Sequence, residues 1–133
     1  MTGALILVVD DTPANLRLAE FLLARAGFVV RTALNATEAR IAVREASPAL
    51  ILMDLQLPGV DGFALTAEFK RDPALASVPI VAMTAYAMTG DDQRAREAGC
   101  DWYLTKPIDP ATFAERIRSY LPASLRSASV TPQ

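Results

Sequence analysis

The side chains best suited to chemistry stand at or just after the ends of short apolar runs. They are Asp10, Asp11, Asp54, Thr84 and Lys106. Three carboxylates brought together repel one another and are costly to bury, and a hard divalent cation such as Mg²⁺ is the usual compensation. A lysine adds a compact positive charge and a threonine adds a hydroxyl donor. This set suits phosphoryl transfer, in which positioning and charge neutralisation do most of the catalysis.

The sequence contains no histidine and a single cysteine, Cys100. The absence of histidine excludes Ser-His and Cys-His catalysis, imidazole zinc sites and phosphohistidine chemistry within the chain. The predicted nucleophile is therefore a carboxylate, and Asp54 is the best candidate because it stands alone opposite the Asp10-Asp11 pair. Without a histidine base, Cys100 is predicted to be a buried structural residue.

Short strands are expected to position these side chains. Three of the runs are almost wholly apolar and lack period-2 alternation, which is typical of strands buried on both faces of a parallel sheet. Two shorter and more mixed runs suit edge or near-edge strands. The predicted strands are Ala4–Val9, Phe28–Ala33, Ala49–Met53, Val78–Met83 and Trp102–Thr105.

Helix signals separate the predicted strands. Caps or first-turn residues mark the helix starts, and glycine or proline follows several of the ends. The predicted helices begin at Thr12-Pro13, at the capping-box sequence Asn35–Glu38, at Gly62, at Thr89 and at Asp109-Pro110. The first of these helices is predicted to end near Gly27, the third near Asp72-Pro73 and the fourth near Gly99.

Strict alternation of five strands and five helices predicts an α/β fold. The expected architecture is a flavodoxin-like, doubly wound parallel sheet, (βα)5, with strand order 2-1-3-4-5 and right-handed crossovers. In this order the ligand site forms at the switch point between the first and third strands. Asp10, Asp11 and Asp54 are therefore expected to meet there, because neighbouring strands lie roughly 4.8 Å apart.

Each candidate residue also has an ordinary structural explanation. Asp10 and Asp11 could cap the first helix, Thr84 could simply end a strand, and the Lys106-Pro107 pair could form a turn. Together these explanations require four independent coincidences at one edge of one sheet, and we reject the combination. An FMN carrier with the same strand order would need a hydroxyl- and glycine-rich phosphate loop after the first strand, where this sequence is acidic.

Five short motifs in order resemble the response-regulator receiver family. They are Val8–Asp11, Met53–Gly59, Asp61-Gly62, Met83–Ala85 and Tyr103–Pro107, and the resemblance extends from Leu5 to about Leu121. Residues 1–121 are therefore predicted to form a receiver domain. Residues 122–133, rich in Ser, Ala and Pro, are predicted to form a flexible tail.

The resemblance implies a phosphoacceptor and a metal site. Asp54 would be the phosphoacceptor. Asp11, Asp54 and the backbone carbonyl of Gln56 would bind Mg²⁺ directly, and Asp10 would act through water. A receiver-like scaffold that binds partners without phosphorylation remains the alternative, and a phosphorylation assay distinguishes the two.

The resemblance also assigns roles around the acceptor. Lys106 would contact the phosphoryl group, and Thr84 would turn toward it while Tyr103 changes rotamer. Gln56 and Tyr86, two residues beyond the acceptor and the threonine, would tune the lifetime of the phosphorylated state. The peptide bond from Lys106 to Pro107 is commonly cis in this family.

The expected partners are proteins of a two-component pathway. A histidine kinase or histidine phosphotransfer protein would supply the phosphoryl group, and a chain with no effector domain would signal through the face formed by its fourth helix, fifth strand and fifth helix, including Arg116, Arg118 and Tyr120. The resemblance is to single-domain regulators of the chemotaxis and cell-cycle type, which catalyse only their own phosphorylation and dephosphorylation.

Charge and hydropathy suggest where the protein works. The net charge of −2 gives no reason to expect nucleic acid or anionic membrane as a partner. No apolar run approaches the roughly 20 residues that cross a bilayer, and the N-terminal run lacks the features of a signal peptide. These observations predict a cytoplasmic location.

Overall fold

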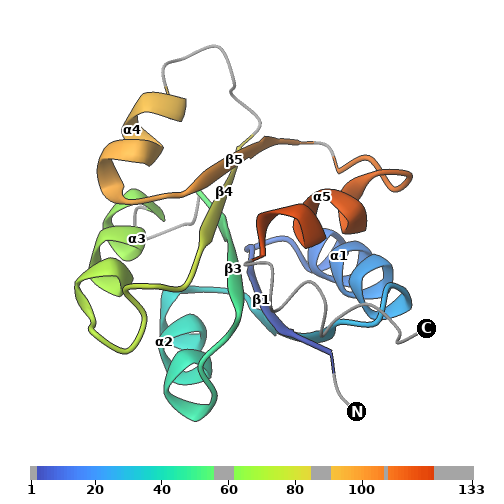
Figure 1. The fold of residues 1–133 in the computed structure, drawn as a ribbon, viewed down its shortest axis with the longest axis horizontal. Coiled ribbons are helices and arrows are strands. Elements are labelled where there is room, and N and C mark those ends of the chain that lie inside the picture. The colour runs from blue at the N-terminus through green and yellow to red at the C-terminus, as the bar shows by residue number, and fades with distance from the viewer. Residues whose placement is uncertain (1–2, 56–61, 85–90, 107, 122–133) are drawn as a thin grey trace.

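The computed structural model describes residues 3–55, 62–84, 91–106 and 108–121. Its strands are β1 (Leu5–Val9), β2 (Val29–Ala33), β3 (Leu50–Asp54), β4 (Ile80–Thr84) and β5 (Trp102–Thr105). Its helices are α1 (Pro13–Arg25), α2 (Ala36–Glu45), α3 (Gly62–Arg71), α4 (Asp91–Ala98) and α5 (Phe113–Tyr120). All paired strands are parallel in the order β2-β1-β3-β4-β5 (Figure 1). The predicted fold class and strand order are confirmed.

Both faces of the sheet are covered by helices. α1 and α5 lie on one face, and α2, α3 and α4 lie on the other (Figure 1). Successive side chains of a strand point to opposite faces, so Ile6 and Val8 pack with α1 while Leu7 and Val9 pack with α2. Every residue of β3 and β4 is buried, which explains why these two strands read as continuous apolar runs.

Local signals account for the start of α2 and the end of α1. Asn35 Oδ1 accepts a hydrogen bond from the Glu38 N–H at 2.9 Å, and Glu38 Oε1 accepts one from the Leu34 N–H at 2.7 Å. This is the predicted capping box with its second bond moved one residue upstream. Gly27 follows α1 with φ 100°, a backbone conformation that favours glycine.

The predicted start of the last helix is wrong by a few residues. Asp109 Oδ1 accepts a hydrogen bond from the Ala111 N–H at 3.0 Å, and the Asp109 carbonyl accepts from Thr112 and Phe113 at 3.2 and 3.0 Å. These bonds form a turn over residues 110–112, and α5 begins only at Phe113. Asp109 therefore caps a turn that leads into the helix.

Lys70, near the end of α3, forms a network of polar contacts at the amino-terminal end of the sheet. Its Nζ lies 2.8 Å from the Val78 carbonyl and 2.9 Å from Asp101 Oδ2. The same Asp101 oxygen accepts the Ile80 N–H at 2.9 Å, and the Asp101 N–H donates to the Ile80 carbonyl at 2.8 Å. The end of α3 and the starts of β4 and β5 are thus fastened to one another.

None of the described helices combines the length and the apolar character needed to span a bilayer. The predicted tail, residues 122–133, lies outside the described residues.

Candidate functional site

The predicted site residues meet at the carboxyl ends of the strands. Asp10 and Asp11 follow β1, Asp54 ends β3, Thr84 ends β4 and Lys106 follows β5. Carboxylate oxygens of the three aspartates lie within 4.8 Å of one another. Parallel pairing of β1 with β3 explains this convergence, because the two strands end side by side at the switch point.

Lys106 bridges the two buried carboxylates. Its Nζ lies 3.1 Å from Asp10 Oδ2 and 3.2 Å from Asp54 Oδ2, and the side chains of these aspartates are 1% and 2% exposed. Burial lowers the pKa of Lys106, but the charges of Asp54 and Asp10 together raise that pKa above its ordinary value. The lysine therefore stays charged at neutral pH and partly offsets the repulsion between the carboxylates.

Asp10 is held by donors of the chain itself. Its Oδ1 accepts the Thr12 N–H at 2.9 Å, and its Oδ2 accepts the Asn15 Nδ2 at 3.4 Å in addition to the Lys106 ammonium. Asp11, in contrast, is exposed. Asp10 is thus already hydrogen-bonded, whereas Asp11 can turn toward a ligand without losing such bonds.

This donor set fits a hard cation. Mg²⁺ prefers one or two carboxylates and keeps several waters, and Asp11 and Asp54 supply two carboxylates beside a third that is occupied by protein donors. The predicted backbone ligand, the carbonyl of Gln56, lies outside the described residues, as do Tyr86 and Pro107.

The start of α3 is pressed against the backbone of the candidate acceptor. A Cβ built on Gly62 would lie 2.6 Å from the carbonyl oxygen of Asp54 and 2.7 Å from the Cα of Leu55. No side chain fits there without moving the backbone. The sequence motif marked Gly62 but gave no indication of this contact with Asp54.

Thr84 and Tyr103 lie on the same face of the sheet. Thr84 is fully buried, and alternation along β4 places it on the same side as Ala82, whose pairing partner on β5 is Tyr103. The ring of Tyr103 packs against the cluster that β4 shares with α2, α3 and α4, and its hydroxyl oxygen is buried. The geometry brings together the two residues predicted to form the switch.

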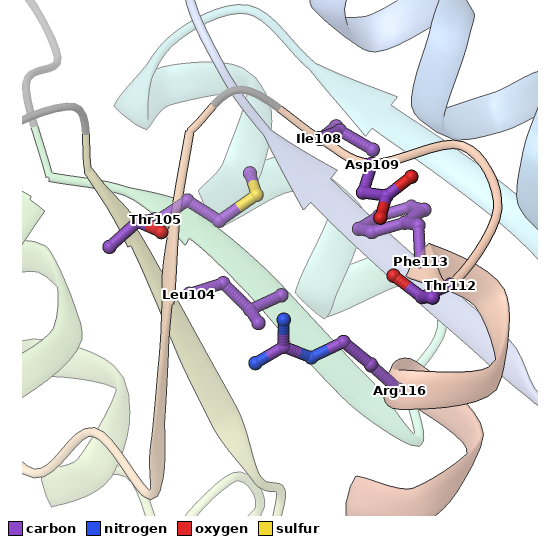
Figure 2. Close-up of a pocket in the computed structure, with 8 residues that line it drawn as sticks. Leu104, Thr105, Ile108, Asp109, Thr112, Phe113 and Arg116 are labelled. Atoms are coloured by element: carbon purple, nitrogen blue, oxygen red, sulfur yellow. The ribbon is translucent and has the colours of Figure 1, made fainter.

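The fifth helix presents its arginines in different directions. Arg116 is exposed beside a cavity of about 200 Å³ lined by Met83, Leu104, Thr105, Ile108, Asp109, Thr112, Phe113 and Arg116, and its guanidinium extends toward Leu104 (Figure 2). Arg118 instead donates to the Ala26 carbonyl at 2.8 Å and lies over the Phe28 ring. Including Arg118 in the predicted partner face was wrong, because its side chain packs against α1 and its following turn.

Two side-chain contacts of α4, β5 and α5 were not predicted. The Arg94 guanidinium of α4 lies 4.2 Å from the ring centroid of Phe63, which follows Gly62 in α3. The Trp102 and Tyr120 rings stack with centroids 4.7 Å apart, and Trp102 is 47% exposed. Both pairs join residues far apart in sequence, and no local pattern indicates them.

Comparison with known proteins places this geometry in a family. Residues 6–118 match the family model of the response regulator receiver domain. The chain is 41% identical over 116 residues to the polar-differentiation response regulator DivK of Brucella anthropi, covering 87% of this chain and 94% of that protein.

Solved structures agree with the match. The chemotaxis response regulator CheY4 of Vibrio cholerae superposes with a TM-score of 0.85 at 26% identity, covering 90% of this chain and all of that one. The receiver domain of the sensor histidine kinase PA1611 of Pseudomonas aeruginosa, with a magnesium ion coordinated in its active-site cleft, gives 0.81 at 32% identity, covering 90% and 98%. The chain belongs to the response regulator receiver family of two-component signalling proteins.

Proposed function

We propose that this protein is a response regulator whose receiver domain accepts a phosphoryl group on Asp54 in a Mg²⁺-dependent reaction. The donor is a histidine kinase or a histidine phosphotransfer protein in the cytoplasm. The observation that carries the proposal is the buried Asp54 carboxylate, 3.2 Å from the Lys106 ammonium and clustered with Asp10 and Asp11. The receiver domain comprises residues 1–121, and residues 122–133 form a tail.

Asp54 is the nucleophile in this reaction. A carboxylate oxygen forms a bond to phosphorus as the bond from phosphorus to the donor's imidazole nitrogen breaks. That nitrogen keeps the bonding electron pair and later takes a proton from solvent. Before transfer, the Lys106 ammonium offsets the negative charge of the Asp54 carboxylate. After transfer, it contacts the phosphoryl oxygens, which then carry the negative charge.

Asp11, Asp54 and the backbone carbonyl of Gln56 would hold Mg²⁺, with Asp10 acting through water. When bound, the ion supplies positive charge that offsets the phosphoryl oxygens and the carboxylates. The exposed Asp11 is free to turn toward a ligand, whereas the Asp10 oxygens already accept hydrogen bonds from the chain.

The conformational switch and the partner-binding surface involve residues at the same edge of the sheet. Thr84 turns toward the phosphoryl oxygens, and Tyr103, beside it on the same face, changes rotamer. The altered surface of α4, β5 and α5 then binds a downstream protein, with Arg116 and Tyr120 on it. Gln56 and Tyr86 tune the lifetime of the phosphorylated state.

Phosphorylation by a small donor tests the function. Incubation with acetyl phosphate and Mg²⁺ should add one phosphate by intact mass, and Asp54→Asn or chelation by EDTA should abolish it. Asp72→Asn, an exposed aspartate at the end of α3, is the matched control and should label like the wild type. Undiminished labelling of Asp54→Asn would exclude Asp54 as the acceptor.

A further inference from the structure

Asn15 contacts the acidic site from α1. Its Nδ2 lies 3.4 Å from Asp10 Oδ2, the same oxygen that lies 3.1 Å from the Lys106 ammonium. The second Asp10 oxygen accepts the Thr12 N–H at 2.9 Å. Two side-chain donors therefore share one oxygen of a carboxylate that is 1% exposed.

The two donors are not equivalent. Protein N–H···O bonds usually span about 2.7–3.2 Å, so the Asn15 contact is long and Lys106 holds the closer position. Lys106 also serves Asp54 at 3.2 Å. A neutral amide on the helix and a cation on the loop after β5 thus share the same acceptor atom.

The shared oxygen matters when Asp54 carries a phosphoryl group. The phosphoryl oxygens attract the Lys106 ammonium. Movement of the ammonium toward them lengthens and weakens its contact with Asp10. A buried carboxylate that loses a charged donor is costly unless another donor takes its place. Asn15 is already positioned beside the vacated oxygen.

We propose that Asn15 is a positioning residue that takes over Asp10 Oδ2 when Lys106 turns to the phosphoryl group. Asn15 keeps Asp10 hydrogen-bonded and in place, and so lowers the cost of moving the lysine. Its contribution is small in the unmodified protein and larger in the phosphorylated one. This inference rests on the proposed function, because it requires a phosphoryl group on Asp54.

Beryllium fluoride, which mimics the phosphoryl group in shape and charge, provides the test. The thermal midpoint of the full chain is measured with Mg²⁺ alone and with Mg²⁺ and increasing beryllium fluoride. Asn15→Ala should respond to Mg²⁺ as the wild type does but bind beryllium fluoride about fivefold more weakly, the value of one ordinary hydrogen bond. Asn15→Gln, which keeps the amide, should recover part of the loss, and the exposed Glu20→Ala on α1 is the control.

The outcomes separate the inference from the proposed function. Failure of the wild type to bind beryllium fluoride in the presence of Mg²⁺ overturns both. Equal binding by the wild type and Asn15→Ala, or equal losses in Asn15→Ala and Asn15→Gln, overturns the role of Asn15 alone.

A double-mutant cycle in the unmodified protein tests the shared oxygen without any phosphoryl group. Lys106→Met leaves Asp10 with Thr12 and Asn15, and adding Asn15→Ala leaves Thr12 alone. The double variant should lose more thermal stability than the two single losses combined. Additive losses would show that the two donors do not substitute for each other and would overturn the proposal.

Discussion

The ammonium of Lys106 lies 3.2 Å from Oδ2 of Asp54, and the same ammonium lies 3.1 Å from Asp10. One cation on a loop therefore serves two carboxylates that are almost wholly buried. Removing it leaves two buried negative charges beside each other, while the remaining donors to Asp10 are neutral.

Lys106→Met should lower the free energy of unfolding by about 1–3 kcal/mol in the absence of divalent cations. Loss of one partner of a fully buried ion pair costs roughly 3–5 kcal/mol, and the 20% exposure of Lys106 reduces this cost through solvent screening. Chemical denaturation in EDTA measures the loss. An unchanged midpoint and slope would contradict the idea that Lys106 stabilises the two carboxylates.

Mg²⁺ at millimolar concentration should raise the thermal midpoint of the wild type, because an ion that binds only the folded protein stabilises it by mass action. Asp11→Asn should show a smaller rise, since it removes one charged ligand of the acidic cluster. Asp72→Asn is the matched control. If Asp11→Asn and the wild type respond equally to Mg²⁺, Asp11 is not a ligand.

Cys100 should be unreactive in the folded protein at pH 8. Burial raises the pKa of this thiol from 9.0 to about 11, so the reactive thiolate is scarce. Labelling by a disulfide reagent should be slow in buffer and fast in guanidinium chloride. Rapid labelling of the native protein would show that the site is open.

The same pKa shift predicts a change of stability with pH. The folded protein keeps the Cys100 proton to higher pH than the unfolded chain does, so this contribution is complete below pH 9 and declines as pH rises toward 11. Cys100→Ala should flatten that decline. A decline of equal steepness in the variant would assign it to other groups.

Arg94→Gln should loosen α4. The guanidinium lies over the Phe63 ring, and a contact of this kind at an exposed site contributes about 0.5–1 kcal/mol. Amide hydrogen exchange should accelerate in residues 93–98 and stay unchanged in α2. Arg17→Gln, at an exposed position on α1, controls for the lost charge; equal acceleration of α4 in both variants would exclude a specific role for Arg94.

Tyr86→Ala should shorten the lifetime of the phosphorylated protein. Tyr86 lies outside the described residues, but its spacing of two from Thr84 predicts that its ring faces the acceptor, where it would hinder the water that attacks the phosphoaspartate. Loss of labelled phosphate after removal of acetyl phosphate gives the rate. An unchanged or longer lifetime would exclude shielding by Tyr86.

The strands and the acidic cluster were predictable from sequence because both follow from local patterns. The buried runs ended at Asp54 and Thr84, and the strand order then required Asp10 to lie beside Asp54. Hydrophobic periodicity and strand pairing are enough for that step.

Side-chain directions on the helices could not be predicted in the same way. Arg116 and Arg118 are two residues apart, yet one borders a cavity and the other reaches back to Ala26. Their directions depend on how α5 is rotated against the sheet, which long-range packing decides. The contact from Asn15 to Asp10 depends similarly on the path of the chain between β1 and α1.

The hydrogen bonds between Asp101 and Ile80 have a consequence for local unfolding. They join the start of β5 to the start of β4, and the two strands pair along their length, so both strands are held in the sheet without any contribution from α4. Among the side chains of α4 whose burial is described, Ala95 is the buried one, and the neighbouring Arg94 lies over the Phe63 ring of α3. Melting α4 would break no strand pairing, and we therefore expect its amide hydrogens to exchange faster than those of β4 and β5.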